Sequence, residues 1–145
     1  GTMLRACACL GLAAAIIEPA GFPVSDRNFR RAGMDYLDMV DLTRHRSWRA
    51  FEEWRAGQGR RLALLTTKAA QPYTDFAFQP GDILMVGRES AGVPDDVHNA
   101  ADARLVIPMR ADLRSLNVAI SATMVIGEAL RQLQVAGRTR TETNT

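Results

Sequence analysis

The sequence predicts an α/β fold in which a mostly parallel sheet is covered by helices on both faces. Short apolar runs typical of buried strands alternate with segments of helical periodicity, and glycine or proline stands at most of the junctions. Strands separated by helices favour parallel pairing, because each helix returns the chain to the same edge of the sheet. The 145 residues, 47% of them hydrophobic, correspond to one ordinary domain with a sizeable core.

The first third of the chain is predicted to contain two helices and two strands. Gly11 ends an N-terminal helix, and Glu18 with Pro19 ends the apolar strand that follows. Ser25 is suited to cap a second helix, with Gly33 beyond its end. The predicted ranges are 2–10 and 25–32 for the helices, and 13–17 and 36–40 for the strands.

The rest of the chain continues this alternation. Trp48, Phe51 and Trp54 share one side of a helix that begins at Ser47, and Pro94 suits the first position of a short helix. The remaining predicted elements are a helix over 47–56, strands over 62–66, 82–86 and 104–107, and a last helix from about 116 to 133. This helix ends near Gly137, so residues 1–137 are predicted to form a single domain and 138–145 a loose tail.

The location of the protein is predicted from what the chain lacks. No stretch approaches the roughly 20 apolar residues that are needed to span a bilayer. Cys7 and Cys9 would diverge by about 200° on a helix, which makes a disulfide between them implausible. We therefore expect a reduced, cytoplasmic protein that is not attached to a membrane.

Positive charge is carried almost entirely by arginine. The chain has 17 arginines and a single lysine, Lys68, and its net charge is +2. The planar guanidinium suits phosphate recognition, so this bias is compatible with an RNA partner and equally with arginines on solvated helix faces. The candidates for RNA contact are Arg27, Arg30, Arg31, Arg44, Arg46 and Arg114.

Three polar loops that follow predicted strands form the candidate site. Ligands of open α/β sheets bind beyond the carboxyl ends of the strands, where such loops converge. The sequence has no dinucleotide-binding glycine motif, Walker loop or nucleophile elbow, and it shows no metal-ligand spacing. His45 and His98 lie far apart, and each is interpreted as a lone surface histidine. The loops are 66–68, 87–93 and 108–117.

Motifs in these loops and near the N-terminus resemble the SPOUT superfamily of α/β-knotted methyltransferases. The chain is most similar to the SpoU-type branch that methylates the ribose 2′-hydroxyl of the tRNA wobble nucleotide, position 34. The similar segments extend along nearly the whole chain, in the order and spacing of the family. They are Arg5, 16–22, 30–36, 65–68, 87–94, 107–109 and 114–117.

The resemblance implies a homodimer with a C-terminal trefoil knot that binds S-adenosylmethionine and tRNA. The methyl group would pass to the ribose hydroxyl, S-adenosylhomocysteine would be the product, and no metal would be needed. The family's cofactor pocket corresponds here to Leu65, Gly87, Glu89, Ile107 and Ser115. Apolar walls with nearby backbone donors and acceptors suit an adenine ring.

The resemblance also assigns catalytic roles to Arg5, Ser115 and Asn117. We expect Arg5 to hold a phosphate and to stabilise the developing alkoxide, because a guanidinium with a pKa above about 12 is an awkward base. Ser115 and Asn117 can instead serve as helix caps, Glu89 as a solvated loop carboxylate, and Arg114 as a salt-bridge partner.

Two departures from the family pattern keep other functions open. The chain begins within the first family motif, so the usual N-terminal strand is apparently absent, and Ala119 stands where relatives often have serine. One alternative is a 2′-O-methyltransferase that acts on another tRNA or rRNA ribose. The other is a non-catalytic RNA-binding remnant of the family.

Overall fold

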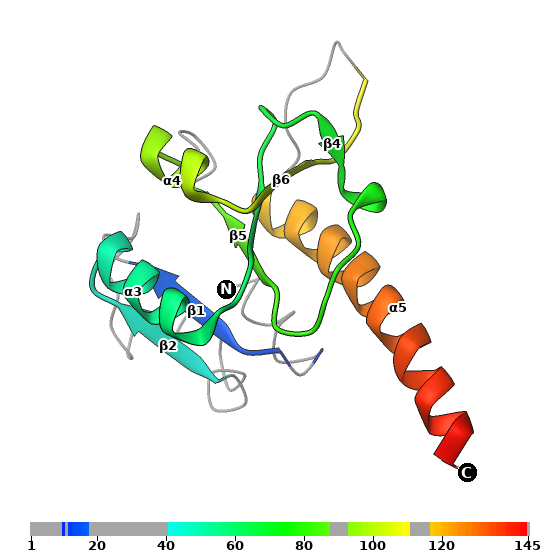
Figure 1. Cartoon of the computed structure of the whole chain (residues 1–145). Helices are drawn as coiled ribbons and strands as arrows, with labels where there is room; N and C mark the ends of the chain where they lie inside the picture. The colour runs from blue at the N-terminus through cyan, green and yellow to red at the C-terminus, as the bar shows by residue number, and fades with distance from the viewer. Residues whose placement is uncertain (1–9, 11, 18–40, 88–92, 111–116, 145) are drawn as a thin grey trace, which may run out of the picture. The chain divides into compact units, whose positions relative to one another are not determined.

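The computed structural model describes residues 10, 12–17, 41–87, 93–110 and 117–144, with residues 135–144 described by their backbone alone. The chain divides into two compact units at Gly59 and Arg60 (Figure 1). Leu10 is helical, as predicted. The rest of the predicted N-terminal helix, the helix over 25–32 and the strand over 36–40 lie outside the described residues. The assignment of residues 1–137 to one domain stays a prediction.

The first unit contains two parallel strands and one helix. Strand β1 (Ala14–Ile17) pairs with β2 (Leu42–His45), and helix α3 (Trp48–Gln58) follows β2 and packs on it. The Ser47 side chain accepts a hydrogen bond from the Ala50 N–H, and Gly59 ends the helix at a φ of 63°. The predictions for β1 and α3 are therefore confirmed to within two residues.

Strand β2 was not predicted from the sequence, which assigns no element to residues 42–45. Thr43 and Arg44 are exposed and Leu42 is half-buried, so only His45 of this strand is buried. A strand with one buried polar residue has no apolar alternation to reveal it. Its hydrogen bonds to the apolar strand β1 define it instead.

The second unit is built on a four-stranded sheet in which every neighbouring pair is parallel. The strand order is β4-β6-β3-β5, so β3 lies between β6 and β5. This arrangement confirms the predicted α/β class with parallel strands. The strands are β3 (Leu62–Leu65), β4 (Gln71–Pro72), β5 (Ile83–Val86) and β6 (Ala103–Val106), and the helices are η2 (Tyr73–Asp75), α4 (Asp95–Ala100) and α5 (Val118–Asn144).

The core of this unit is centred on β3. Consecutive residues Leu62, Ala63 and Leu64 are all buried, as expected for an interior parallel strand that is covered on both faces. Val125 of α5 is fully buried as well, and α5 contacts both β5 and η2. The C-terminal helix therefore closes the core of the second unit.

The predicted boundaries of two helices differ from the structure, and two short elements were not predicted. The short helix begins at Asp95 and Pro94 caps it, whereas proline was expected inside the first turn. The two-residue strand β4 and the single turn η2 are too short to give a periodic pattern. Helix α5 continues to Asn144, beyond its predicted end near Gly137, because one glycine costs a helix only about 1 kcal/mol relative to alanine.

Among the helices of the described residues, none is long and apolar enough to cross a membrane.

Candidate active site at the carboxyl edge of the second sheet

Three predicted cofactor-binding residues lie at the carboxyl edge, which we define as the C-terminal ends of β3, β5 and β6. Leu65, the last residue of β3, is in register with Val86 on one side and with Leu105 on the other. Gly87 follows Val86 directly, and Ile107 follows two residues after Leu105. The parallel sheet thus brings together three residues that lie up to 42 positions apart in the sequence (107 − 65 = 42).

The exposure of these residues suits a partly open apolar site. Ile107 is buried, with 7% of its surface exposed, whereas Leu65 and Gly87 are half-buried. An isoleucine packed in the core and a more accessible leucine can form the floor and wall of an apolar site. Gly87 has no side chain, so a ligand can approach its backbone closely.

Asn117 joins the carboxyl edge to α5. Its Oδ1 accepts hydrogen bonds from the backbone N–H of Ala119 at 2.8 Å and of Ile120 at 3.3 Å. The predicted capping role of Asn117 is therefore confirmed, and its side chain remains exposed. Its predicted catalytic role remains a prediction.

Several predicted site residues lie outside the described residues. They are Arg5, Glu89 and Ser115 of the catalytic and cofactor-binding sets, and Arg27, Arg30, Arg31 and Arg114 of the RNA-binding set.

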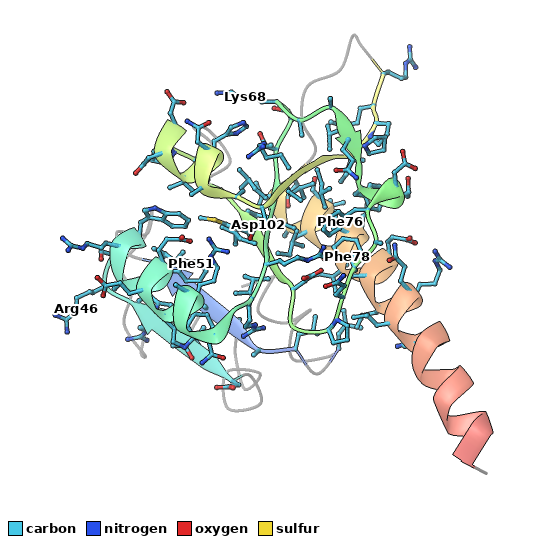
Figure 2. All side chains as sticks on the ribbon, in the orientation of Figure 1. Arg46, Phe51, Lys68, Phe76, Phe78 and Asp102 are labelled. Atoms are coloured by element: carbon cyan, nitrogen blue, oxygen red, sulfur yellow. The ribbon has the colours of Figure 1, made fainter. Side chains whose placement is uncertain are left out.

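Two of the predicted RNA-binding residues are described, and both lie in the first unit. Arg44 in β2 and Arg46 just after it are exposed, and Arg46 forms no ion pair with the carboxylates of the described residues (Figure 2). Arg49, on the first turn of α3, lies 3.4 Å from Glu53 in a solvent-exposed pair. Such a pair contributes at most about 1 kcal/mol, so it leaves Arg49 accessible to an anionic partner.

The interpretation of His45 as a surface histidine is wrong. His45 is 8% exposed, and its ring lies 5.3 Å from the Phe51 ring, edge-on, and 5.1 Å from the Trp54 ring. Its Nε2 has no hydrogen-bond partner among the described residues. As the last residue of β2, His45 faces the aromatic side of α3, which a sequence without an apolar pattern at 42–45 does not reveal.

Side-chain interactions stabilise the opposite edge of this sheet, the amino edge, at which β3, β5 and β6 begin. Arg61 Nε donates to Asp82 Oδ1 at 2.8 Å, and the Arg61 guanidinium carbon lies 4.8 Å from the centre of the Phe76 ring. Burial opposes ionisation of Asp82, but hydrogen bonds from Arg61 and from the Gln79 N–H outweigh it and hold the pKa of Asp82 below its usual range. The hydrogen bond to Asp82 raises the pKa of Arg61.

No group of three or more histidine, cysteine, aspartate or glutamate side chains in the described part of the chain is placed to hold a metal ion.

The sequence as a whole matches one family. The SpoU rRNA methylase family model matches residues 1–127. The chain is 71% identical over 133 residues to a tRNA (cytidine(34)-2′-O)-methyltransferase of Beijerinckia indica subsp. indica, which covers 92% of this chain and 83% of that protein. The chain therefore belongs to the SpoU methylase family, and the resemblance found in its motifs is confirmed.

Solved structures agree with this assignment. A structure described as "Structural insights into the 2-OH methylation of C/U34 on tRNA" matches with a TM-score of 0.84 and 36% identity, covering 92% of this chain and 86% of that one. The SpoU methyltransferase AviRb of Streptomyces viridochromogenes, in complex with the cofactor AdoMet, shares the fold at a TM-score of 0.83 and 24% identity, covering 92% of this chain and 55% of its own. The trefoil knot follows from membership of the family, and its predicted loops include residues 88–92 and 111–116, outside the described residues.

Proposed function

We propose that this protein methylates the 2′-hydroxyl of the ribose at position 34 of tRNA, with S-adenosylmethionine as the methyl donor. The observation that carries this proposal is the 71% identity, over nearly the whole chain, to a relative named for that reaction. The apolar carboxyl edge, with Leu65, Gly87 and Ile107 side by side, supplies a place for the cofactor.

In this proposal the cofactor is bound by the three described residues at the carboxyl edge and by two residues from the neighbouring loops. Leu65 and Ile107 contact the adenosyl group, Gly87 lets its backbone approach, and Glu89 and Ser115 contribute polar groups. Adenosylmethionine supplies an electrophilic methyl group and leaves as S-adenosylhomocysteine. No metal takes part in this reaction.

The ribose hydroxyl must be oriented and activated by the chain, because a neutral alcohol is a poor nucleophile. In our proposal Arg5 holds an adjacent phosphate and stabilises negative charge on the 2′-oxygen as its proton passes to solvent water. The new O–C bond forms as the methyl–sulfur bond breaks. Ser115 and Asn117 shape the loop through which the oxygen approaches.

The tRNA itself is held, in this proposal, by arginines of both units. Arg46 is supported by its exposure and by the lack of a carboxylate partner among the described residues, and Arg44 by its exposed position on β2. The other members of the set are Arg27, Arg30, Arg31 and Arg114. In this proposal the enzyme acts on tRNA in the cytoplasm, and residues 1–137 form one methyltransferase domain.

We further propose that the protein is a homodimer that uses the first half of α5. Ile120 and Met124 are 55% and 40% exposed and lie one turn apart on the same side of the helix. A Cβ added at Gly127 would meet nothing within 4 Å, so this side is open to a second helix. The Ile120→Lys variant is expected to sediment as a monomer, whereas a dimeric Ile120→Lys protein would refute this surface.

The proposed reaction is tested by incubating tRNA with the protein and adenosylmethionine and locating the new methyl group by nucleoside mass spectrometry. We expect a single 2′-O-methyl group at position 34, and none on a tRNA with 2′-deoxyribose there. A methyl group on another ribose would support the alternative of a related enzyme with a different target. If calorimetry detected no binding of adenosylmethionine, the protein would be a non-catalytic remnant.

A further inference from the structure

The loop that follows β3 is held in a defined turn at the carboxyl edge. The Thr66 N–H donates to the Leu105 carbonyl of β6 at 2.9 Å, which continues the sheet by one residue. Thr66 Oγ1 accepts from the Lys68 N–H at 3.2 Å, and the Thr66 carbonyl accepts from the Ala69 N–H at 3.3 Å. One short-range hydrogen bond from Lys68 and one from Ala69 to Thr66 therefore hold the turn of residues 66–69 that carries Lys68.

The Lys68 side chain carries an exposed positive charge in the loop that follows β3. Its side chain is exposed, and it has no ion-pair or hydrogen-bond partner among the described residues (Figure 2). It is also the single lysine of the chain, among 17 arginines. Because β3 lies between β5 and β6, its loop stands between the strands that carry Gly87 and Ile107.

We propose that Lys68 binds a backbone phosphate of the RNA substrate beside the ribose that receives the methyl group. This inference rests on the proposed function and extends its RNA-binding set, which otherwise contains only arginines. An acceptor that reaches a methyl donor at the carboxyl edge carries phosphates on both sides of its ribose, and Lys68 is fixed at that edge. A lysine ammonium is a compact point charge, suited to one phosphate oxygen and not to reading a base.

The exposure of Lys68 argues for RNA as its ligand, as opposed to the carboxylate of the cofactor. A cofactor held between Leu65 and Ile107 would occupy the apolar part of the edge, whereas Lys68 lies on the solvent side of the loop. A large polyanion can reach an exposed ammonium without burying it. Cofactor affinity therefore serves as the internal control.

The first test compares Lys68→Ala and Lys68→Arg with the wild type in tRNA binding at several salt concentrations. Removing one phosphate contact is expected to weaken binding about tenfold and to lower the slope of log K against log salt by about 1. Lys68→Arg should restore most of the affinity. The KM for tRNA should rise with kcat unchanged, because the contact is present in both ground and transition states.

A matched charge control comes from Arg131 on α5, an exposed residue paired with Glu128 about 20 Å further along the helix than Asn117. Arg131→Gln removes the same charge away from the carboxyl edge, so its salt slope should equal that of the wild type. If Lys68→Ala left the affinity and the salt slope unchanged, or changed only the affinity for adenosylmethionine, the proposal would be overturned.

The single lysine permits a second, mutation-free test on the 145-residue chain. Acetylation of the Lys68 amine removes its charge and should weaken tRNA binding as Lys68→Ala does, whereas reductive dimethylation keeps the charge and should not. Bound tRNA should slow acetylation of Lys68, read by peptide mass spectrometry. Equal losses from both modifications would contradict a charge-based contact. These readouts measure binding alone, so a wild-type protein that bound tRNA but transferred no methyl group would overturn only the proposed function.

Discussion

The two edges of the second sheet are built differently. At the amino edge, where β3, β5 and β6 begin, side chains are tied to one another and to the backbone. The pair Arg61–Asp82 links the starts of β3 and β5, and Asp102 accepts the Leu62 N–H at 2.7 Å while its own N–H binds the Leu62 carbonyl. Gln132 of α5 donates to the Phe76 carbonyl and accepts from the Phe78 N–H.

At the carboxyl edge, the described side chains are more accessible, and two of their hydrogen bonds are local. Leu65 and Gly87 are half-buried and Lys68 is exposed. Thr66 Oγ1 accepts from the Lys68 N–H of its own loop, and Asn117 Oδ1 accepts from the Ala119 N–H in the first turn of α5. In our proposal, the amino edge stabilises the unit and the carboxyl edge binds ligands, as is general for parallel α/β sheets.

The adjacent residues Leu64 and Leu65 offer the largest expected contrast between stability and binding. Leu64 is fully buried, so Leu64→Ala should lower the free energy of unfolding by about 2–5 kcal/mol. The half-buried Leu65 should lose less stability on change to alanine but bind adenosylmethionine more weakly. Urea unfolding measures the change in stability of both variants, and calorimetry measures their affinity for adenosylmethionine. If Leu65→Ala lost stability only, Leu65 would be a core residue and no part of the site.

The Arg61–Asp82 pair should affect stability without affecting binding. Asp82→Asn is expected to cost about 1–2 kcal/mol, a modest value because a third of the Arg61 side chain is exposed and screened. The pKa of Asp82 is lowered in the fold, so its contribution is present above the pKa of an unfolded aspartate, about 3.9, and is lost as the pH falls through the lower folded value. Thermal melts from pH 7 to 2 should therefore show a shallower acid decline for the variant. An unchanged cofactor affinity is the control.

Asn117 caps α5 and is also predicted to take part in catalysis, so its variants can separate these two roles. Asn117→Ala should destabilise α5 by about 1 kcal/mol, whereas Asn117→Asp keeps a capping oxygen and the stability of the wild type. If Asn117 also acts on the reacting ribose, both variants should lose methyl transfer. A fully active Asn117→Asp protein would limit this residue to its capping role.

Substitution of Glu128 should have the smallest effect on stability. Hydrogen bonds from Arg131 and Gln132 lower the pKa of Glu128 to about 2. Its contribution to stability is thus present above the pKa of an unfolded glutamate, about 4.3, and is lost as the pH falls towards 2. In the Glu128→Gln variant, the melting temperature should decrease slightly less between pH 4.5 and 2 than it does in the wild type. A change in methyl transfer at neutral pH would show that this part of α5 does more than stabilise.

The parallel α/β fold and the position of the candidate site could be predicted from the sequence, because buried apolar strands and the polar loops after them have recognisable patterns. Leu65, Gly87 and Ile107 were placed at one site by the resemblance, and the register of three parallel strands brings them together. Strand β2 and the burial of His45 were missed, because their stability comes from pairing and from aromatic contacts that are distant from any local pattern. The sequence also did not reveal that the Lys68 side chain has no ion-pair partner among the described residues, since ion pairing depends on the folded structure.

The division between the two edges is tested most directly by hydrogen–deuterium exchange with and without saturating adenosylmethionine. Exchange should slow in peptides that contain residues 65–68, 87 and 107–120, and remain unchanged in peptides from residues 76–82. Protection at residues 76–82 without protection at the carboxyl edge, or no protection anywhere, would contradict the account.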